Sequence, residues 1–197
     1  MKANRANRPN ICFSEAQPKA RSLTTLKMNG LHVSSLREKA FLGLSSLLYL
    51  QLKDTRISHL ADKVFQKLSN LKQLDLSHNL RLLNLPHKVF SGMKNLQKLN
   101  LSGSRSIFKT HYWCEETDFN AEKNMFAELP ELTVLDLSKT GFNPWSDSKM
   151  FARNTKLQEL RITDNNMQFI TNSMIDTFKS LSVLDMRNIH LVQDIIV

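Results

Sequence analysis

Large aliphatic residues recur in one fixed frame along most of the chain. The frame is LxxLx[LMI], and its first residues are Leu23, Leu47, Leu71, Leu96, Leu132, Leu157 and Leu181. Successive starts are separated by 24, 24, 25, 36, 25 and 24 residues. Inside a frame the pattern alternates, because Leu26 and Met28 are apolar whereas Thr25, Lys27 and Asn29 are polar. This alternation predicts a short strand with one buried face, and an amphipathic helix does not explain a motif that returns every 24 residues.

Two further positions repeat after each frame. A phenylalanine follows the first five frames at the same place and is replaced by Ile175 in the sixth; the predicted structural spine is Phe41, Phe65, Phe90, Phe126 and Phe151. Three residues after the last aliphatic position we expect a buried polar side chain that bonds backbone groups of the turn, clearest at Asn79 and Asn165. Thr55, Ser104 and Thr140 occupy this column in other units, whereas Leu31 and Ile189 cannot serve it. The first and last units are therefore expected to be the least regular.

A period of 20–29 residues with LxxLxL is the signature of leucine-rich repeats, whose units stack because none can bury its apolar face alone. We predict an α/β-type repeat solenoid: a leucine-rich repeat horseshoe with a parallel sheet on the concave side and a mostly irregular or 3₁₀ convex side. The repeats cover residues 23–197, and the last is incomplete. Residues 1–22 form a basic segment or a partial cap, and the long fourth spacing indicates an insert within residues 104–124.

The chemistry-bearing residues do not form a recognisable catalytic or metal-binding motif. The sequence contains no GxGxxG, GxxxxGK[ST], HExxH, GxSxG or CxxC spacing, so neither an enzymatic function nor a cofactor is predicted. Its two cysteines, Cys12 and Cys114, are separated by three to four predicted strands, which is about 14–19 Å at roughly 4.8 Å per strand. A disulfide requires Cα atoms within about 7 Å. Free thiols are therefore favoured over a disulfide.

Targeting signals are also missing from the chain as it stands. No apolar core follows the basic start, so residues 1–10 are not a secretory signal peptide. The longest apolar-rich stretch, residues 41–52, is shorter than the roughly 20 residues that a membrane span needs. We expect no membrane span in this chain.

Two surfaces are candidates for binding a partner. The outward-facing residues of the predicted concave strands include Tyr49, Gln51, Lys53, Lys98 and Arg161. The 27 basic and 18 acidic residues give a net charge of +9, but the outward strand positions are nearly neutral, so a nucleic-acid groove is not favoured.

The second candidate surface is the insert. It carries Tyr112 and Trp113, aromatic residues of the kind that anchor interfaces, although the same two side chains could simply pack on the coil. The triplet Asn100-Leu101-Ser102 is an acceptor for N-glycosylation at Asn100. It also lies inside the repeated LxLS pattern, which can produce such a triplet by chance. Both interpretations stay open for each feature.

The whole unit, LxxLxLxxNxLxxLxxxxFxxLxx, resembles the typical extracellular class of leucine-rich repeats. The segments Leu71–Asn79 and Leu132–Ser138 are most similar to those of Toll-like receptor ectodomains. The resemblance covers residues 23–197 and implies a fragment of an innate immune signalling receptor, a glycoprotein whose parent lies at the cell surface and forms a receptor dimer. It further implies a protein, glycan or other microbial ligand bound on the concave face or the insert.

Two other functions remain open on the residues alone. Decorin-like and Slit-like proteins share the same unit, which keeps a structural or adhesion role outside the cell as an alternative. An intracellular leucine-rich repeat scaffold is the third. The parent's domains beyond this chain would separate the three.

We predict that Trp113→Ala weakens binding of a partner more than Lys27→Ala does, because aromatic side chains dominate interface hot spots, where truncation costs about 2 kcal/mol or more. Affinity measured for both variants, with unfolding curves as the control, tests this. Equal losses of affinity, or a loss explained by unfolding, would show that Trp113 only packs on the coil.

Overall fold

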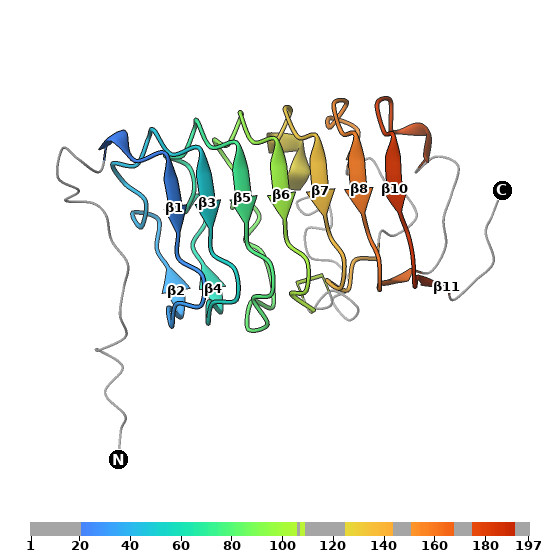
Figure 1. Cartoon of the computed structure of the whole chain (residues 1–197), viewed down its shortest axis with the longest axis horizontal. Coiled ribbons are helices and arrows are strands. Elements are labelled where there is room, and N and C mark those ends of the chain that lie inside the picture. The colour runs from blue at the N-terminus through green and yellow to red at the C-terminus, as the bar shows by residue number, and fades with distance from the viewer. Residues whose placement is uncertain (1–20, 106, 109–124, 144–150, 168–174, 192–197) are drawn as a thin grey trace, which may run out of the picture.

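The computed structural model describes residues 21–105, 107–108, 125–143, 151–167 and 175–191. Seven three-residue strands make one parallel sheet in chain order: β1 (Thr25–Lys27), β3 (Tyr49–Gln51), β5 (Gln73–Asp75), β6 (Lys98–Asn100), β7 (Val134–Asp136), β8 (Glu159–Arg161) and β10 (Val183–Asp185). Figure 1 shows the strands side by side across the molecule. The predicted leucine-rich repeat solenoid with a parallel sheet is confirmed.

The register of the sheet follows the repeat frame. Central leucines pair with central leucines along the whole sheet, as in Leu50 with Leu74 and Leu135 with Leu160. The central leucines of the five inner strands are buried, and those of the end strands, Leu26 and Leu184, are partly buried. The residues before and after them in each strand face away from the core. The sheet therefore presents two outward rows of side chains, one from the first and one from the third residue of each strand.

The remaining elements are short. Two lateral two-stranded sheets pair β2 (Ser35–Leu36) with β4 (His59–Leu60), and β9 (Asn166–Met167) with β11 (His190–Leu191). The 3₁₀ helix η2 (Met125–Glu128) lies behind the sheet in Figure 1, in agreement with the predicted irregular and 3₁₀ convex side. Within the part of the chain that the structure describes, no helix has the length and apolar character of a membrane span.

The phenylalanines form stacks in the core on the side away from the sheet. Phe41 and Phe65 stack with ring centroids 5.7 Å apart, and Phe126 lies between Phe90 at 6.1 Å and Phe151 at 5.7 Å. All five are buried. Such aromatic pairs contribute about 0.5–1.5 kcal/mol each beyond the area they bury.

The sixth unit departs from the predicted spine. Ile175 is 42% exposed, and Phe178 packs on Phe151 instead, with ring centroids 5.5 Å apart. The prediction of Ile175 at this place is therefore wrong. A fixed count of residues assigned the position, whereas the ring that can stack is three residues farther on.

The polar column, which is the set of residues three positions after the last aliphatic residue of each frame, satisfies buried backbone groups in the turn after the strand. The Asn79 amide donates to the carbonyls of Leu52 (2.9 Å) and Leu76 (2.7 Å), and its oxygen accepts the N–H of Thr55 at 2.9 Å. Asn165 repeats the arrangement three coils on, with donation to Leu137 and Ile162 at 2.9 Å. Each asparagine thus joins its own coil to the preceding one.

Two other positions of the column are served by hydroxyl groups. The Thr140 hydroxyl donates to the Leu137 carbonyl at 2.6 Å, and Ser104 is buried with its oxygen accepting the Asn79 N–H at 3.1 Å. Leu31, in the first unit, is 40% exposed and has no side-chain donor to contribute.

The residue just before this column adopts a left-handed conformation in every unit: Gly30, Asp54, His78, Gly103, Lys139, Asp164 and Asn188 all have positive φ. The N–H of each of the first six donates to a carbonyl of the next coil, for example Gly103 to Ser138 at 2.8 Å. A Cβ on Gly103 would lie 2.7 Å from His78 Nδ1, so a larger residue here would require the His78 side chain to move.

We predict that Asn79→Ala lowers the free energy of unfolding by more than about 2 kcal/mol, because an unsatisfied buried polar group costs about 1–3 kcal/mol and this change orphans several. Urea unfolding of the full chain measures it. The matched control is Asn70→Ala, which removes an exposed asparagine bonded to the Ser45 carbonyl. If both substitutions cost the same, the buried amide does not hold the coils together.

Candidate ligand-binding surface

An open groove of about 470 Å³ runs over the concave face of the sheet from β1 to β8. Four of the predicted contact residues line it together: Tyr49, Gln51, Lys98 and Arg161. They come from β3, β6 and β8, and each points outward because it flanks a buried central leucine. Tyr49 keeps 38% of its surface exposed.

The two outward rows give this groove its geometry. The first-residue row places Gln73 of β5 between Tyr49 and Lys98. The third-residue row runs from Lys27 through Gln51, Asp75, Asn100 and Asp136 to Arg161. Since neighbouring strands lie about 4.8 Å apart, Tyr49 and Lys98 are separated by roughly 10 Å. A ligand lying across the strands would meet a new side chain at each step.

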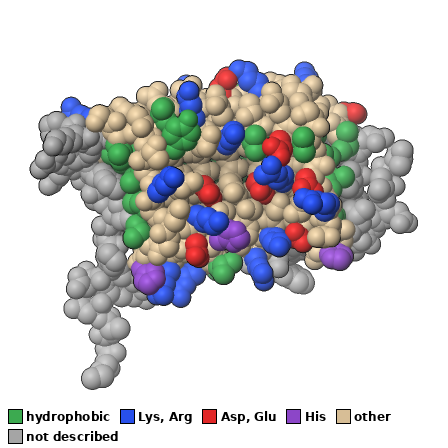
Figure 2. Space-filling view, viewed as in Figure 1, with side chains coloured by type: hydrophobic (Ala, Val, Ile, Leu, Met, Phe, Trp, Pro, Cys, Tyr) green, Lys and Arg blue, Asp and Glu red, His purple; other side chains and the backbone are tan. Residues whose placement is uncertain are grey.

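Ion pairs concentrate at the C-terminal half of the sheet. Arg161 lies 3.9 Å from Asp136 and forms a second, closer ion pair with Glu159. Lys139 and Asp164 follow at 3.8 Å. Figure 2 shows acidic and basic side chains next to one another over this half of the sheet.

The N-terminal half differs. Lys27, Lys53 and Lys98 are exposed, and none of them forms an ion pair with any described residue. The charges along the strands do nearly balance, as counted from the sequence, but the two signs are not evenly mixed. The acids of the C-terminal half are neutralised locally, and the lysines of the N-terminal half remain available to an anionic group.

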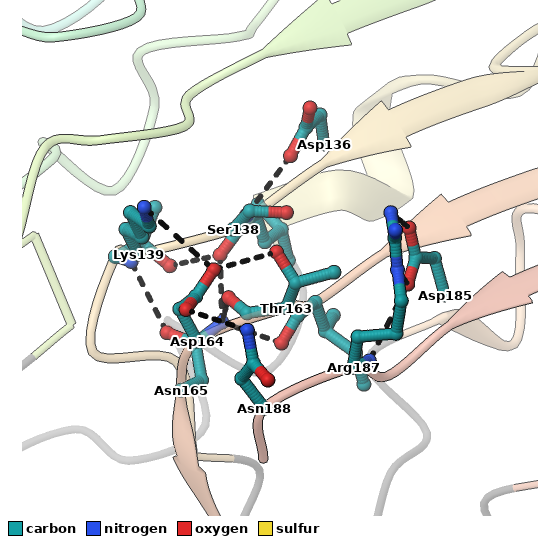
Figure 3. A network of polar contacts seen from close by, with 12 residues as sticks. Asp136, Ser138, Lys139, Thr163, Asp164, Asn165, Asp185, Arg187 and Asn188 are labelled. Atoms are coloured by element: carbon teal, nitrogen blue, oxygen red, sulfur yellow. Dashed lines mark hydrogen bonds and ion pairs between the residues drawn. The ribbon is translucent and has the colours of Figure 1, made fainter.

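A second hollow, nearer the C-terminal end of the sheet, is lined mainly by polar residues, and several of their side chains already bond to one another. Asp164 accepts hydrogen bonds from the Thr163 hydroxyl at 3.1 Å and the Asn188 amide at 3.3 Å, as well as contacting Lys139 (Figure 3). A ligand here would have to replace these contacts. The first groove therefore offers the better binding surface.

Arg187 donates hydrogen bonds to both oxygens of the Asp185 carboxylate. Its Nε donates to Oδ1 at 2.9 Å and its Nη2 to Oδ2 at 2.7 Å (Figure 3). These hydrogen bonds lower the pKa of Asp185, although partial desolvation opposes them, and the same contact raises the pKa of Arg187.

Asn100 is half-buried in the wall of the groove, and its side chain has a role in the backbone. Its oxygen accepts the N–H of Ser102 at 2.9 Å. Asp75 and Asp136 do the same for Ser77 and Ser138 at 2.9 Å. The recurring Asp/Asn-Leu-Ser triplet is therefore the sequence signal of a local turn closed by the Asp or Asn side chain. Glycosylation of Asn100 stays a prediction.

Several predicted residues do not meet in the groove. Lys53 follows β3 and lies outside the lining; its N–H donates to Asn29 Oδ1 at 3.1 Å. Tyr112, Trp113, Cys12 and Cys114 lie outside the described residues. Among the residues described, no group of three or more His, Cys, Asp and Glu side chains could hold a metal ion.

Other lining residues were not selected as contacts from the sequence. Gln73, Asp75 and Lys27 line the groove, and Asn100 was singled out only as a glycan acceptor. All of them occupy the two outward rows, so the repeat register was the signal that could have identified them. The predicted contacts were instead mostly aromatic and cationic residues, because these types are common in binding sites.

A family model described as "Leucine rich repeat" matches residues 21–80. Among solved structures, the chain is similar to the one titled "Crystal structure of TLR13-ssRNA13 complex", with a TM-score of 0.72 and 25% sequence identity over 87% of this chain. The chain spans 22% of the length of that protein. No curated protein matches it.

We predict that Arg187→Gln raises the pKa of Asp185 toward its ordinary value, because the charged hydrogen bonds that favour the carboxylate are lost. A lowered pKa in the folded state means that this pair stabilises the fold at neutral pH. Its contribution disappears as the pH falls through the pKa of Asp185. Titration of the Asp185 carboxyl by NMR measures the shift, with Arg153→Gln as the control, and an unchanged pKa would refute the assignment.

Proposed function

We propose that this leucine-rich repeat protein, which resembles a fragment of a Toll-like receptor ectodomain, recognises a microbial protein or glycan in the groove on its concave face. The observation that carries the proposal is the meeting of Tyr49, Gln51, Lys98 and Arg161 from separate strands in one open groove. The parent molecule would be a cell-surface receptor of innate immunity that signals as a dimer.

The chemistry of the groove supports recognition. An exposed tyrosine offers a rigid apolar face with a polar tip, which suits a sugar ring or an aliphatic side chain. Next to it, Gln51 and Gln73 present amides that both donate and accept hydrogen bonds. Lys27 and Lys98, which form no ion pair with a described residue, add positive charge at the ends of this set. The ligand should therefore carry hydroxyl or amide groups together with a negative charge.

The groove supports binding better than catalysis. Its titratable lining consists of lysine, tyrosine, aspartate and arginine side chains on separate strands, and Asp75 and Asp136 are engaged in turns through their carboxylates. We infer no acid–base or nucleophilic pair from this arrangement.

Single-stranded RNA is the second candidate ligand. The similar structure is titled as a complex of TLR13 with ssRNA13. Near-neutral strand charges argued against a nucleic-acid groove, but the pairing of acids at one end leaves the lysines of the other end free to meet phosphates. The uncompensated charge is small, so a protein or glycan remains the first candidate.

The test compares Tyr49→Ala and Lys98→Ala with Lys94→Ala, which changes an exposed lysine of the third repeat outside the groove. Binding of the full chain to an array of bacterial and fungal polysaccharides, surface proteins and single-stranded RNA is measured first. On the best ligand, Tyr49→Ala should weaken affinity by about thirtyfold, the equivalent of roughly 2 kcal/mol. Lys98→Ala should weaken it severalfold.

The control variant should bind as the unmodified chain does. Loss of binding only with RNA, and with a strong salt dependence, would select the second candidate. If no member of the array binds, or if all three variants bind equally, the groove is not the recognition surface.

A further inference from the structure

The third repeat contains one extra residue in the turn that follows its strand. Leu80 and Arg81 both lie between the buried Asn79 and the buried Leu82. In the second repeat Arg56 alone lies between the buried Thr55 and Ile57. The extra residue comes after Asn79, so the turn up to the buried asparagine keeps the conformation and inter-coil bonds that it has in the adjacent repeats. Leu80 and Arg81 are both exposed.

The result is an exposed pair of leucines. Leu80 is 63% exposed and Leu83 is 52% exposed, more than any other large hydrophobic residue that the structure describes. At the position of Leu80, the second and fourth repeats have Arg56 and Arg105, and at the position of Leu83 the second repeat has Ser58. The leucines therefore replace polar residues on a solvent-facing edge.

The surrounding turns hold Leu80 in place. Asn79, the residue before it, is fixed by the hydrogen bonds described above, and the Leu82 N–H donates back to the Asn79 carbonyl at 3.0 Å. The turns of the adjacent repeats stack against this one through Asp54 N to Ser77 O at 3.0 Å and His78 N to Ser102 O at 2.7 Å. An apolar side chain presented on a rigid backbone loses little conformational entropy on binding.

Positive charge surrounds the leucines. Residues 53–57, 77–83 and 102–105 carry four cations, Lys53, Arg56, Arg81 and Arg105, against one carboxylate, Asp54. None of the four cations forms an ion pair within the described part of the chain. Along the edge where the strands end, Figure 2 shows hydrophobic surface with basic side chains on either side.

We propose that this edge, defined by Leu80, Leu83, Arg56, Arg81 and Arg105, binds an acidic segment of a partner protein that places an apolar side chain against the two leucines. Arginine pairs with carboxylates in a planar, two-point geometry, and such pairs surrounding an apolar centre are typical of protein interfaces. The edge lies outside the concave groove, so one molecule could hold a ligand and a protein partner together.

Other occupants fit less well. A second copy of this chain would bring a net charge of +9 to the edge, and its acids on the C-terminal strands are already paired. Membrane binding scales with the apolar area that enters the lipid, and two leucines supply little.

The test uses a labelled peptide in which glutamates alternate with leucines, titrated with the full chain and followed by fluorescence anisotropy. A peptide with alanine in place of leucine, at equal charge, isolates the apolar contact. The double variant Leu80→Ser/Leu83→Ser should lower the affinity for the leucine peptide by about tenfold or more and leave the affinity for the alanine peptide unchanged. Arg81→Glu should lower the affinity for both peptides.

The matched control is Val183→Ser, which removes another exposed aliphatic side chain far along the sheet and should not change the affinity. Unfolding curves of each variant exclude global destabilisation. The proposal is overturned if both peptides bind equally, or if the double variant behaves as the control does. It is also overturned if the edge substitutions alter only self-association or binding to vesicles of anionic lipid.

Discussion

The inner coils of this solenoid, from the second to the sixth, bury backbone N–H and C=O groups in the turn that follows the concave strand. These groups point away from the ladder of the sheet, and water cannot reach them. A short polar side chain satisfies them, best at Asn79 and Asn165, where one amide joins two successive coils. The spacing of the strands, the stacking of the phenylalanines and the outward rows of the sheet all depend on this turn having the same shape in each repeat.

That regularity gives the concave surface its particular kind of specificity. Because register partners share a row, a change of one residue alters one position on the surface and leaves the backbone as it was. Individual residues on a common frame therefore set the charge pattern. Acids pair with arginines at β7, β8 and β10, whereas the lysines at β1 and β6 form no ion pair within the described part of the chain. A surface of this type can change its ligand without changing its fold.

The period of the leucines was sufficient to place all seven strands of the sheet, because stacking forces each unit to bury the same positions. A fixed number of residues from the frame did not predict the stacked position in the sixth unit, where Phe178 takes the place of Ile175 in the stack. The lateral sheets repeat with the same 24-residue spacing, but two residues per strand are too few to distinguish a strand from a loop by alternation. In the groove, the choice of Tyr49 and Lys98 followed from residue type, but the uneven distribution of ion pairs depends on side-chain rotamers, which a count of charges cannot supply.

Glycosylation of Asn100, which stays a prediction, would have a direct consequence for the groove. Its side chain lies in the groove wall, between Asp75 and Asp136 in the third-residue row. A branched oligosaccharide attached to its amide nitrogen would fill the space that a ligand needs, while leaving the oxygen free to keep the turn with Ser102. A cell that modifies this asparagine would produce a folded molecule with a closed concave face, and the edge at Leu80 would then be the exposed recognition surface. Enzymatic sugar transfer could thus determine which of two surfaces the same chain presents.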